Sequence, residues 1–210
     1  MKEHWAVFPP FLGGVVFIFN YDDFVKSYWR YYLLLENKFL QTVNYVEVAK
    51  DNFSTYSVEY AYLLQSIGGE LDNFFKIYCG FQLGDRKTMN DYQTLVIEKY
   101  PTIISEKISL REYKLELSPF ASWNEHSLDW WKAYNAVKHN RTDNMASASL
   151  KNVLNILAAL FLLEMKYLKE GSDVEKTPDI PTTKSMLFSL PDWKFEYMDG
   201  GEAFVYFLNH

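Results

Sequence analysis

Cysteine is almost missing from this sequence, because Cys79 is the only one in 210 residues. No disulfide can therefore form within the chain, which fits a reducing compartment, and we expect a cytoplasmic protein. Four scattered histidines and one cysteine also make no cluster of the kind that holds structural zinc. No phosphate-binding, dinucleotide-binding or zinc-protease motif occurs, so we expect neither a metal nor a cofactor.

Long hydrophobic runs are missing as well. The run at residues 15–19 is too short for the apolar core of a signal peptide. The longest apolar stretch in the last long predicted helix, residues 156–163, is bracketed by Asn155 and Glu164 and is too short to cross a bilayer. We therefore expect a core helix there and no membrane partner.

An excess of positive charge is the third thing the chain lacks. It has 21 Lys and Arg against 27 Asp and Glu, a formal net charge of -6. Such a chain gains nothing from long-range attraction to nucleic acid, which weighs against a DNA-coating role. Any contact with nucleic acid would require a local basic patch.

Hydrophobic residues, by contrast, are plentiful at 49%, and aromatic residues reach 18%. This composition is typical of a globular protein, and the length suits one domain over residues 1–210. Apolar residues at helical spacing predict long helices, and their bounds are set by capping residues, glycines and prolines. We expect helices near residues 22–41, 54–78, 88–100, 122–141 and 143–170.

Short β-rich segments are predicted at both ends of the chain. Residues 5–8 and 15–19 are rich in aromatic or β-branched residues and are bounded by Pro and Gly pairs. Near the C-terminus, alternating aromatic residues at 193–197 are followed by a turn at 199–201 and a returning strand. Residues 108–117 predict one bulged strand or two short strands.

The fold class that follows is mainly α, with a small β element (α+β by segregation). We expect a bundle of four long helices as the core over residues 22–170. The β element is expected to form from the terminal segments, residues 1–20 and 184–210.

Residues 128–141 form the segment with the clearest chemical potential. On a helix, Asn135 and His139 lie four residues apart and share one face. Lys132, Lys138 and Arg141 add positive charge, with no acidic residue between 130 and 141. An imidazole can transfer the proton of a ribose 2′-hydroxyl near neutral pH, and a cation stabilises the phosphate charge. The alternative is structural, because cations also favour the C-terminal end of a helix.

A polar-x-x-x-His element on a long helix, followed at once by a second long apolar helix, resembles the HEPN superfamily of helical bundles. Ribonuclease members of that superfamily carry an Arg-x(4–6)-His motif, often with a polar residue directly after the arginine. There, two protomers pair so that two motifs form one metal-independent site. The resemblance covers about residues 54–170 and implies a homodimer, with RNA as the candidate substrate.

This resemblance implies roles for individual residues. His139 would be the general acid or base, and Asn135 would orient it. Tyr134 stands where the family has arginine, which favours an alternative: a non-catalytic dimerisation or protein-interaction scaffold. The remaining candidates would bind substrate or position other site residues. The substrate-binding candidates are Lys138, Arg141, Lys132 and Trp131, and the positioning candidates are Glu70 and Tyr134.

Overall fold

Helices dominate the computed structural model. The structure describes residues 6–7, 18–19, 21–110, 112–171, 181, 183–191, 193–198 and 201–206. Side chains are described for residues 21–110, 112–170, 181 and 183–191. The α-helices are α1 (Tyr21–Phe24), α2 (Arg30–Thr42), α3 (Val58–Tyr78), α4 (Met89–Lys99), α5 (Asp129–His139) and α6 (Leu150–Gly171). A π-helical segment, η1 (Val25–Trp29), joins α1 to α2, and the short 3-10 turns are η2 (Lys50–Asn52), η3 (Pro101–Ile104) and η4 (Met145–Ser147). The prediction of a mainly helical protein is confirmed.

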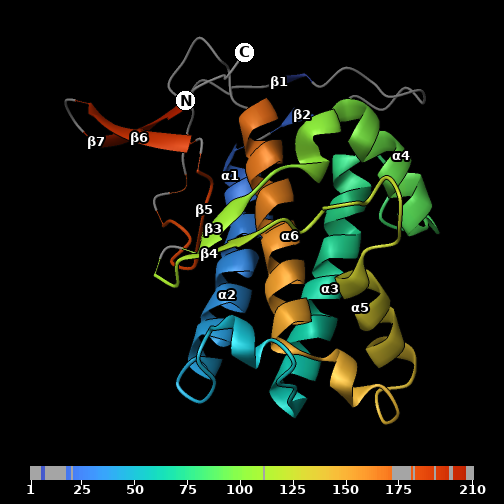
Figure 1. Ribbon diagram of the computed structural model, residues 1–210. Helices are drawn as coiled ribbons and strands as arrows, with labels where there is room; N and C mark the ends of the chain where they lie inside the picture. Colours follow the sequence, from blue (N-terminus) through green and yellow to red (C-terminus); the bar gives the residue numbers. More distant parts are fainter. Residues whose placement is uncertain are drawn as a thin grey trace.

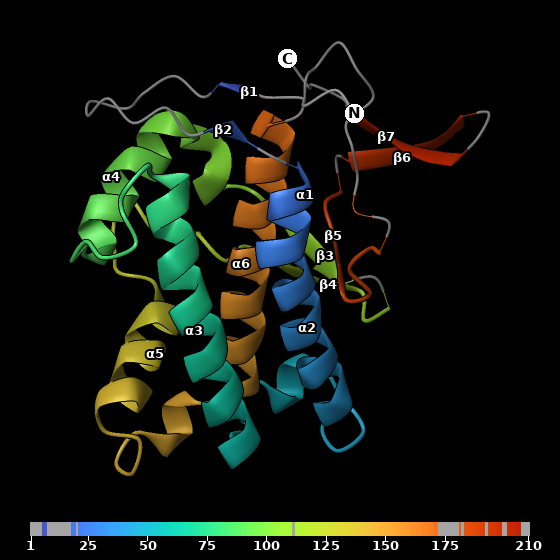
Figure 2. The same ribbon diagram turned by 180° about the vertical axis from the view of Figure 1, so that it is seen from behind.

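The centre of the molecule is the pair α3 and α6, which lie side by side along most of their length (Figure 1). The segment α1–η1–α2 packs on one side of this pair and α5 on the other, as the reverse view confirms (Figure 2). α6 is buried almost throughout between residues 153 and 168. This apolar helix forms the centre of the core, and the elements that carry the polar sites described below pack around it.

The helix predicted over residues 22–41 is present, but a π-helical turn interrupts it. In this turn the backbone N–H of Arg30 donates to the carbonyl of Val25, five residues earlier. The extra residue shifts the buried face by one position. Trp29 and Tyr32 are therefore in the core, whereas Tyr31 is 39% exposed.

A three-stranded antiparallel sheet lies beside α2 and α6, with the order β4-β3-β5 (Figure 1). Its hairpin consists of β3 (Ile108–Leu110) and β4 (Leu115–Leu117), so the second of the two predicted arrangements for this segment is confirmed. The third strand, β5 (Phe188–Ser189), pairs with β3. The small sheet is thus built mainly from the middle of the chain.

The terminal strands pair within their own segments. β1 (Ala6–Val7) pairs with β2 (Ile18–Phe19), and β6 (Trp193–Met198) pairs with β7 (Gly201–Tyr206), both antiparallel. Strands are thus present in both terminal segments, as predicted, and they form two separate hairpins instead of one shared sheet. The predicted turn residues 199 and 200 lie outside the described residues.

The helix predicted over residues 122–141 begins seven residues later than expected, at Asp129 instead of Ser122. Ser122 has a φ of 59°, which is left-handed backbone and cannot start a helix. Trp123, the next residue, is buried against Phe75 and Phe120, and this packing holds the segment in turns. The last helix likewise begins at Leu150, after the 3-10 turn η4.

A buried carboxylate fixes the C-terminal segment to α2. Glu36 is 2% exposed and accepts hydrogen bonds from the Tyr32 hydroxyl at 2.6 Å, the Met186 backbone N–H at 2.9 Å and the Leu187 backbone N–H at 3.3 Å. The Ser185 hydroxyl donates to it as well. Buried carboxylates require such partners, and this one is fully supplied.

Candidate functional site

The end of α5 is the region that the sequence singles out, and it is exposed to water. His139 is the last residue of this helix, and its side chain is exposed, as are those of Lys138, Asn140 and Arg141. Within the described part of the chain, His139 makes no hydrogen bond or ion pair. The imidazole is therefore free to meet a ligand from solvent.

Asn135 lies on α5 as predicted, one turn before His139, and is partly buried. Its side-chain amide donates to the backbone carbonyl of Trp131 at 3.1 Å, on its own helix. No hydrogen bond joins it to His139 among the described residues. The structure thus places the two residues on one helix without the orienting contact that we expected.

The cations of this segment have different surroundings. Lys132 forms an ion pair with Asp129 at 3.6 Å in the first turn of α5, nearly two turns before His139. The Lys138 ammonium lies 5.2 Å from the centre of the Tyr134 ring, a cation–π distance. Arg141 follows the helix and has no ion pair within the described ranges. Lys138 and Arg141 are therefore the cations available near His139.

Tyr134 and Trp131 serve the packing of α5. Tyr134 is 4% exposed and lies so close to Gly68 of α3 that a Cβ there would be 2.3 Å from its ring. Trp131 is partly buried and contacts the rings of Trp130 and Tyr134. Because Gly68 has no Cβ, it allows this close approach of α3 and α5.

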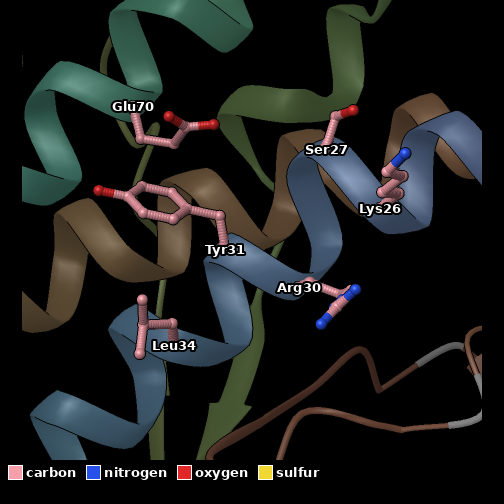
Figure 3. A pocket seen from close by; sticks show the side chains of 6 residues that line it. All are labelled: Lys26, Ser27, Arg30, Tyr31, Leu34 and Glu70. Carbon is pink, nitrogen blue, oxygen red and sulfur yellow. The ribbon is translucent and has the colours of Figure 1, made fainter.

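Glu70 is not near the basic end of α5. It lies two residues after Gly68 on α3, and at 100° per residue this places it on the opposite side of the helix. There it lines a hollow of about 600 Å³ with Lys26, Ser27, Arg30, Tyr31 and Leu34. Figure 3 shows Glu70 on α3, with Lys26 on η1 and Arg30 on α2 also lining the hollow and the Arg30 side chain pointing away from Glu70.

A second carboxyl lies in the interior and interacts with Glu70, although it does not line the hollow. Glu164 of α6 is 0% exposed, and among the described residues neither of its carboxyl oxygens has a hydrogen-bond partner. Burial, and then the charge of Glu70, raise the pKa of Glu164 well above its usual value. Burial, followed by the charges of Glu70 and Glu164, raises the pKa of Tyr28. These three groups therefore interact electrostatically.

The burial of Glu164 was not predicted from the sequence, because this residue marks the polar boundary of an apolar stretch. The signal was available, since Leu157, Leu160 and Leu168 recur at helical spacing and Glu164 occupies the position between the last two. A charged residue within the apolar stripe of a helix predicts a buried polar group, and such groups cluster at functional sites.

Among the described residues, no three His, Cys, Asp or Glu side chains gather to hold a metal ion. No described helix is both long and apolar enough to span a bilayer. Comparison of the chain with family models, curated proteins and solved structures gave no match.

Proposed function

We propose that this chain is a HEPN-like ribonuclease that cleaves RNA without a metal ion at the end of α5. The observation that carries the proposal is the exposure of His139 at the last turn of the helix, unpaired in the described structure and adjacent to Lys138. An acidic protein that presents an imidazole and cations at one helix end has the local patch that contact with RNA requires.

The chemistry follows from the side chains. His139 accepts the proton of a ribose 2′-hydroxyl as that oxygen attacks the adjacent phosphorus. Lys138 and Arg141 stabilise the charge that develops on the phosphate oxygens. The bond from phosphorus to the 5′-oxygen then breaks, and that oxygen takes a proton, leaving a 2′,3′-cyclic phosphate and a 5′-hydroxyl.

A homodimer is part of this proposal. One imidazole that has accepted a proton cannot at the same moment donate one to the leaving oxygen. Within each protomer the long helices α2, α3, α5 and α6 would form the four-helix bundle. In a dimer of the HEPN type, the partner's His139 would supply the second proton. Activity would then fall steeply when the protein is diluted below its dimerisation constant.

The experiment is RNA cleavage in the presence of a chelator by wild type, His139→Ala and a matched control, His126→Ala. His126 is also an exposed histidine but lies before α5. We expect His139→Ala to lose activity about 100-fold or more, as is typical for removal of a general base or acid. The His126 variant should keep its activity within about twofold. A wild type without cleavage would contradict the proposal.

The second candidate function is a non-catalytic interaction scaffold, favoured by the role of Tyr134. At the position where the HEPN motif has its arginine, this side chain is buried against Gly68 and fastens α5 to α3. The chelator experiment separates the two functions, since a scaffold leaves RNA intact in every variant.

A further inference from the structure

The hollow between η1–α2 and α3 has two sides of different chemistry. On the α3 side Glu70 presents a carboxyl group, and on the η1–α2 side Lys26 and Arg30 present cations (Figure 3). Within the described structure none of these three residues forms an ion pair or a side-chain hydrogen bond. Its volume of about 600 Å³ lies within the range of small-molecule sites. Opposite charges that share a hollow without pairing leave both available to a ligand.

Behind the carboxyl side lie interacting polar groups that lack hydrogen-bond partners within the described residues. Glu70, Glu164 and the Tyr28 hydroxyl interact electrostatically, yet none forms a side-chain hydrogen bond within the described residues. Nearly all buried polar groups in proteins have a partner, so a carboxyl such as Glu164 with two orphaned oxygens demands an explanation. The missing partner is a group rich in donors.

A primary ammonium group fits these acceptors best. It carries three N–H donors, which matches the two carboxyl groups and one phenol oxygen. A metal ion fits less well, because the described residues contain no cluster of three His, Cys, Asp or Glu ligands. The cations on the opposite side repel a second positive charge and attract an anion.

We propose that this hollow binds a small zwitterion, with its ammonium group between Glu70 and Glu164 and its carboxylate or phosphate group toward Lys26 and Arg30. The proposal is independent of RNA cleavage at the end of α5. It also gives Glu164 a role that packing does not supply, because an apolar residue at this position would fit the buried face of α6 without an unsatisfied group.

In this proposal the route from the hollow to Glu164 passes Tyr28, whose ring packs beside Phe24 and Phe74. Glu164 has no exposed surface, whereas Tyr28 is only half-buried and belongs to the π-helical segment η1. π-Helical turns occur frequently at functional sites. In this proposal the Tyr28 side chain turns outward to admit the ammonium group, and its hydroxyl then contributes the third acceptor.

Calorimetric titration tests the proposal with named probes at millimolar concentration. The zwitterions are β-alanine, 4-aminobutanoate and O-phosphoethanolamine, and the matched single-charge compounds are butylamine and butanoate. We expect at least one zwitterion to bind about tenfold more tightly than butylamine and butanoate. The carboxylate and phosphate probes together distinguish the two sources of negative charge.

Three substitutions assign the contacts. Glu70→Gln and Glu164→Gln keep the side-chain shape and should each weaken zwitterion binding about tenfold or more. Arg30→Gln should remove the advantage of the zwitterion over butylamine. The control is Lys38→Gln, which changes an α2 lysine that lies over Tyr62 and not at the hollow. Circular dichroism confirms that each variant is folded.

The outcomes that overturn the proposal are equally specific. Wild type that binds no zwitterion at millimolar concentration has no such site. Binding that survives both glutamine substitutions does not use these carboxyl groups. Displacement of a bound zwitterion by calcium or magnesium, with tighter binding of the metal alone, would make the hollow a metal site instead.

Discussion

The two polar regions of this molecule differ in the free-energy cost of their unpartnered groups. At the end of α5, His139 and Arg141 are exposed, and water satisfies them at little cost. In the interior, the Glu164 carboxyl is buried without a hydrogen bond among the described residues, and such a group costs about 1–3 kcal/mol. Hydration alone accounts for the exposed groups, whereas the buried carboxyl has a free-energy cost that calls for a functional explanation.

Glu36 makes this contrast sharper, because it is as buried as Glu164 and yet fully hydrogen-bonded. The fold is thus capable of satisfying a buried carboxylate and does so where the carboxylate anchors the C-terminal segment. The same chain leaves Glu164 without a hydrogen bond in the described structure. Structural and functional carboxyl groups can therefore be distinguished by their partners.

The largest effect is expected for Glu36→Ala. This substitution leaves the Tyr32 and Ser185 hydroxyls and the backbone N–H groups of residues 186 and 187 without their acceptor. We expect a loss of about 3–5 kcal/mol in the free energy of unfolding, measured by urea denaturation. The exposed control Glu112→Ala should change it by about 0.5 kcal/mol or less. A loss at Glu36 no larger than that of the control would remove the contrast.

Glu164→Met should have the opposite sign. It replaces an unsatisfied buried carboxyl with an apolar side chain of similar length, so the free energy of unfolding should rise by about 1–3 kcal/mol. Urea denaturation of both proteins at neutral pH measures the difference. A destabilised variant would mean that Glu164 has a stabilising partner in solution.

Substitutions at two adjacent glycines, Gly68 and Gly69, test the packing on two sides of α3. A Cβ at Gly68 would be 2.3 Å from the ring of the buried Tyr134, so Gly68→Ala should destabilise the protein by about 1–3 kcal/mol. A Cβ at Gly69 meets nothing within 4 Å, so Gly69→Ala should stabilise it by up to about 1 kcal/mol. Thermal denaturation of both variants provides the comparison, and equal effects would contradict the close contact of α3 with α5.

A pH dependence of stability is expected from Glu164 itself. Because the pKa of Glu164 is raised in the folded state, the folded protein keeps a proton that the unfolded chain releases above the usual glutamate value of 4.5. Stability should therefore fall as the pH rises from that value toward the folded pKa, by up to about 1.4 kcal/mol per pH unit. Glu164→Gln should remove this part of the slope. A slope identical in both proteins would show that Glu164 titrates normally.

Much of the helical framework could be predicted from residue spacing and caps. Ser57 caps α3 through a hydrogen bond to the Tyr60 N–H, and Thr88 with Asp91 forms the capping box of α4. These signals are local, so a single sequence contains them. The start of α5 was mispredicted because Trp123 is held by Phe75 and Phe120, a tertiary contact that overrides the local capping pattern.

The candidate sites also combine features that local sequence predicts with features that depend on tertiary packing. The placement of Asn135 and His139 on one helix follows from their spacing, and both lie on α5. The hollow did not follow, since it depends on a π-helical turn that moves Tyr31 outward and on the packing of α3 against α2. No local pattern specifies which side of α3 Glu70 faces until its neighbours are placed.

The ends of the RNA fragments test the central claim most directly. If His139 activates a ribose 2′-hydroxyl, the fragments produced in chelator carry 2′,3′-cyclic phosphates and 5′-hydroxyls, as mass spectrometry of a short defined RNA would show. Fragments that carry 3′-hydroxyls and 5′-phosphates, or a substrate that stays intact at every protein concentration, would contradict the account.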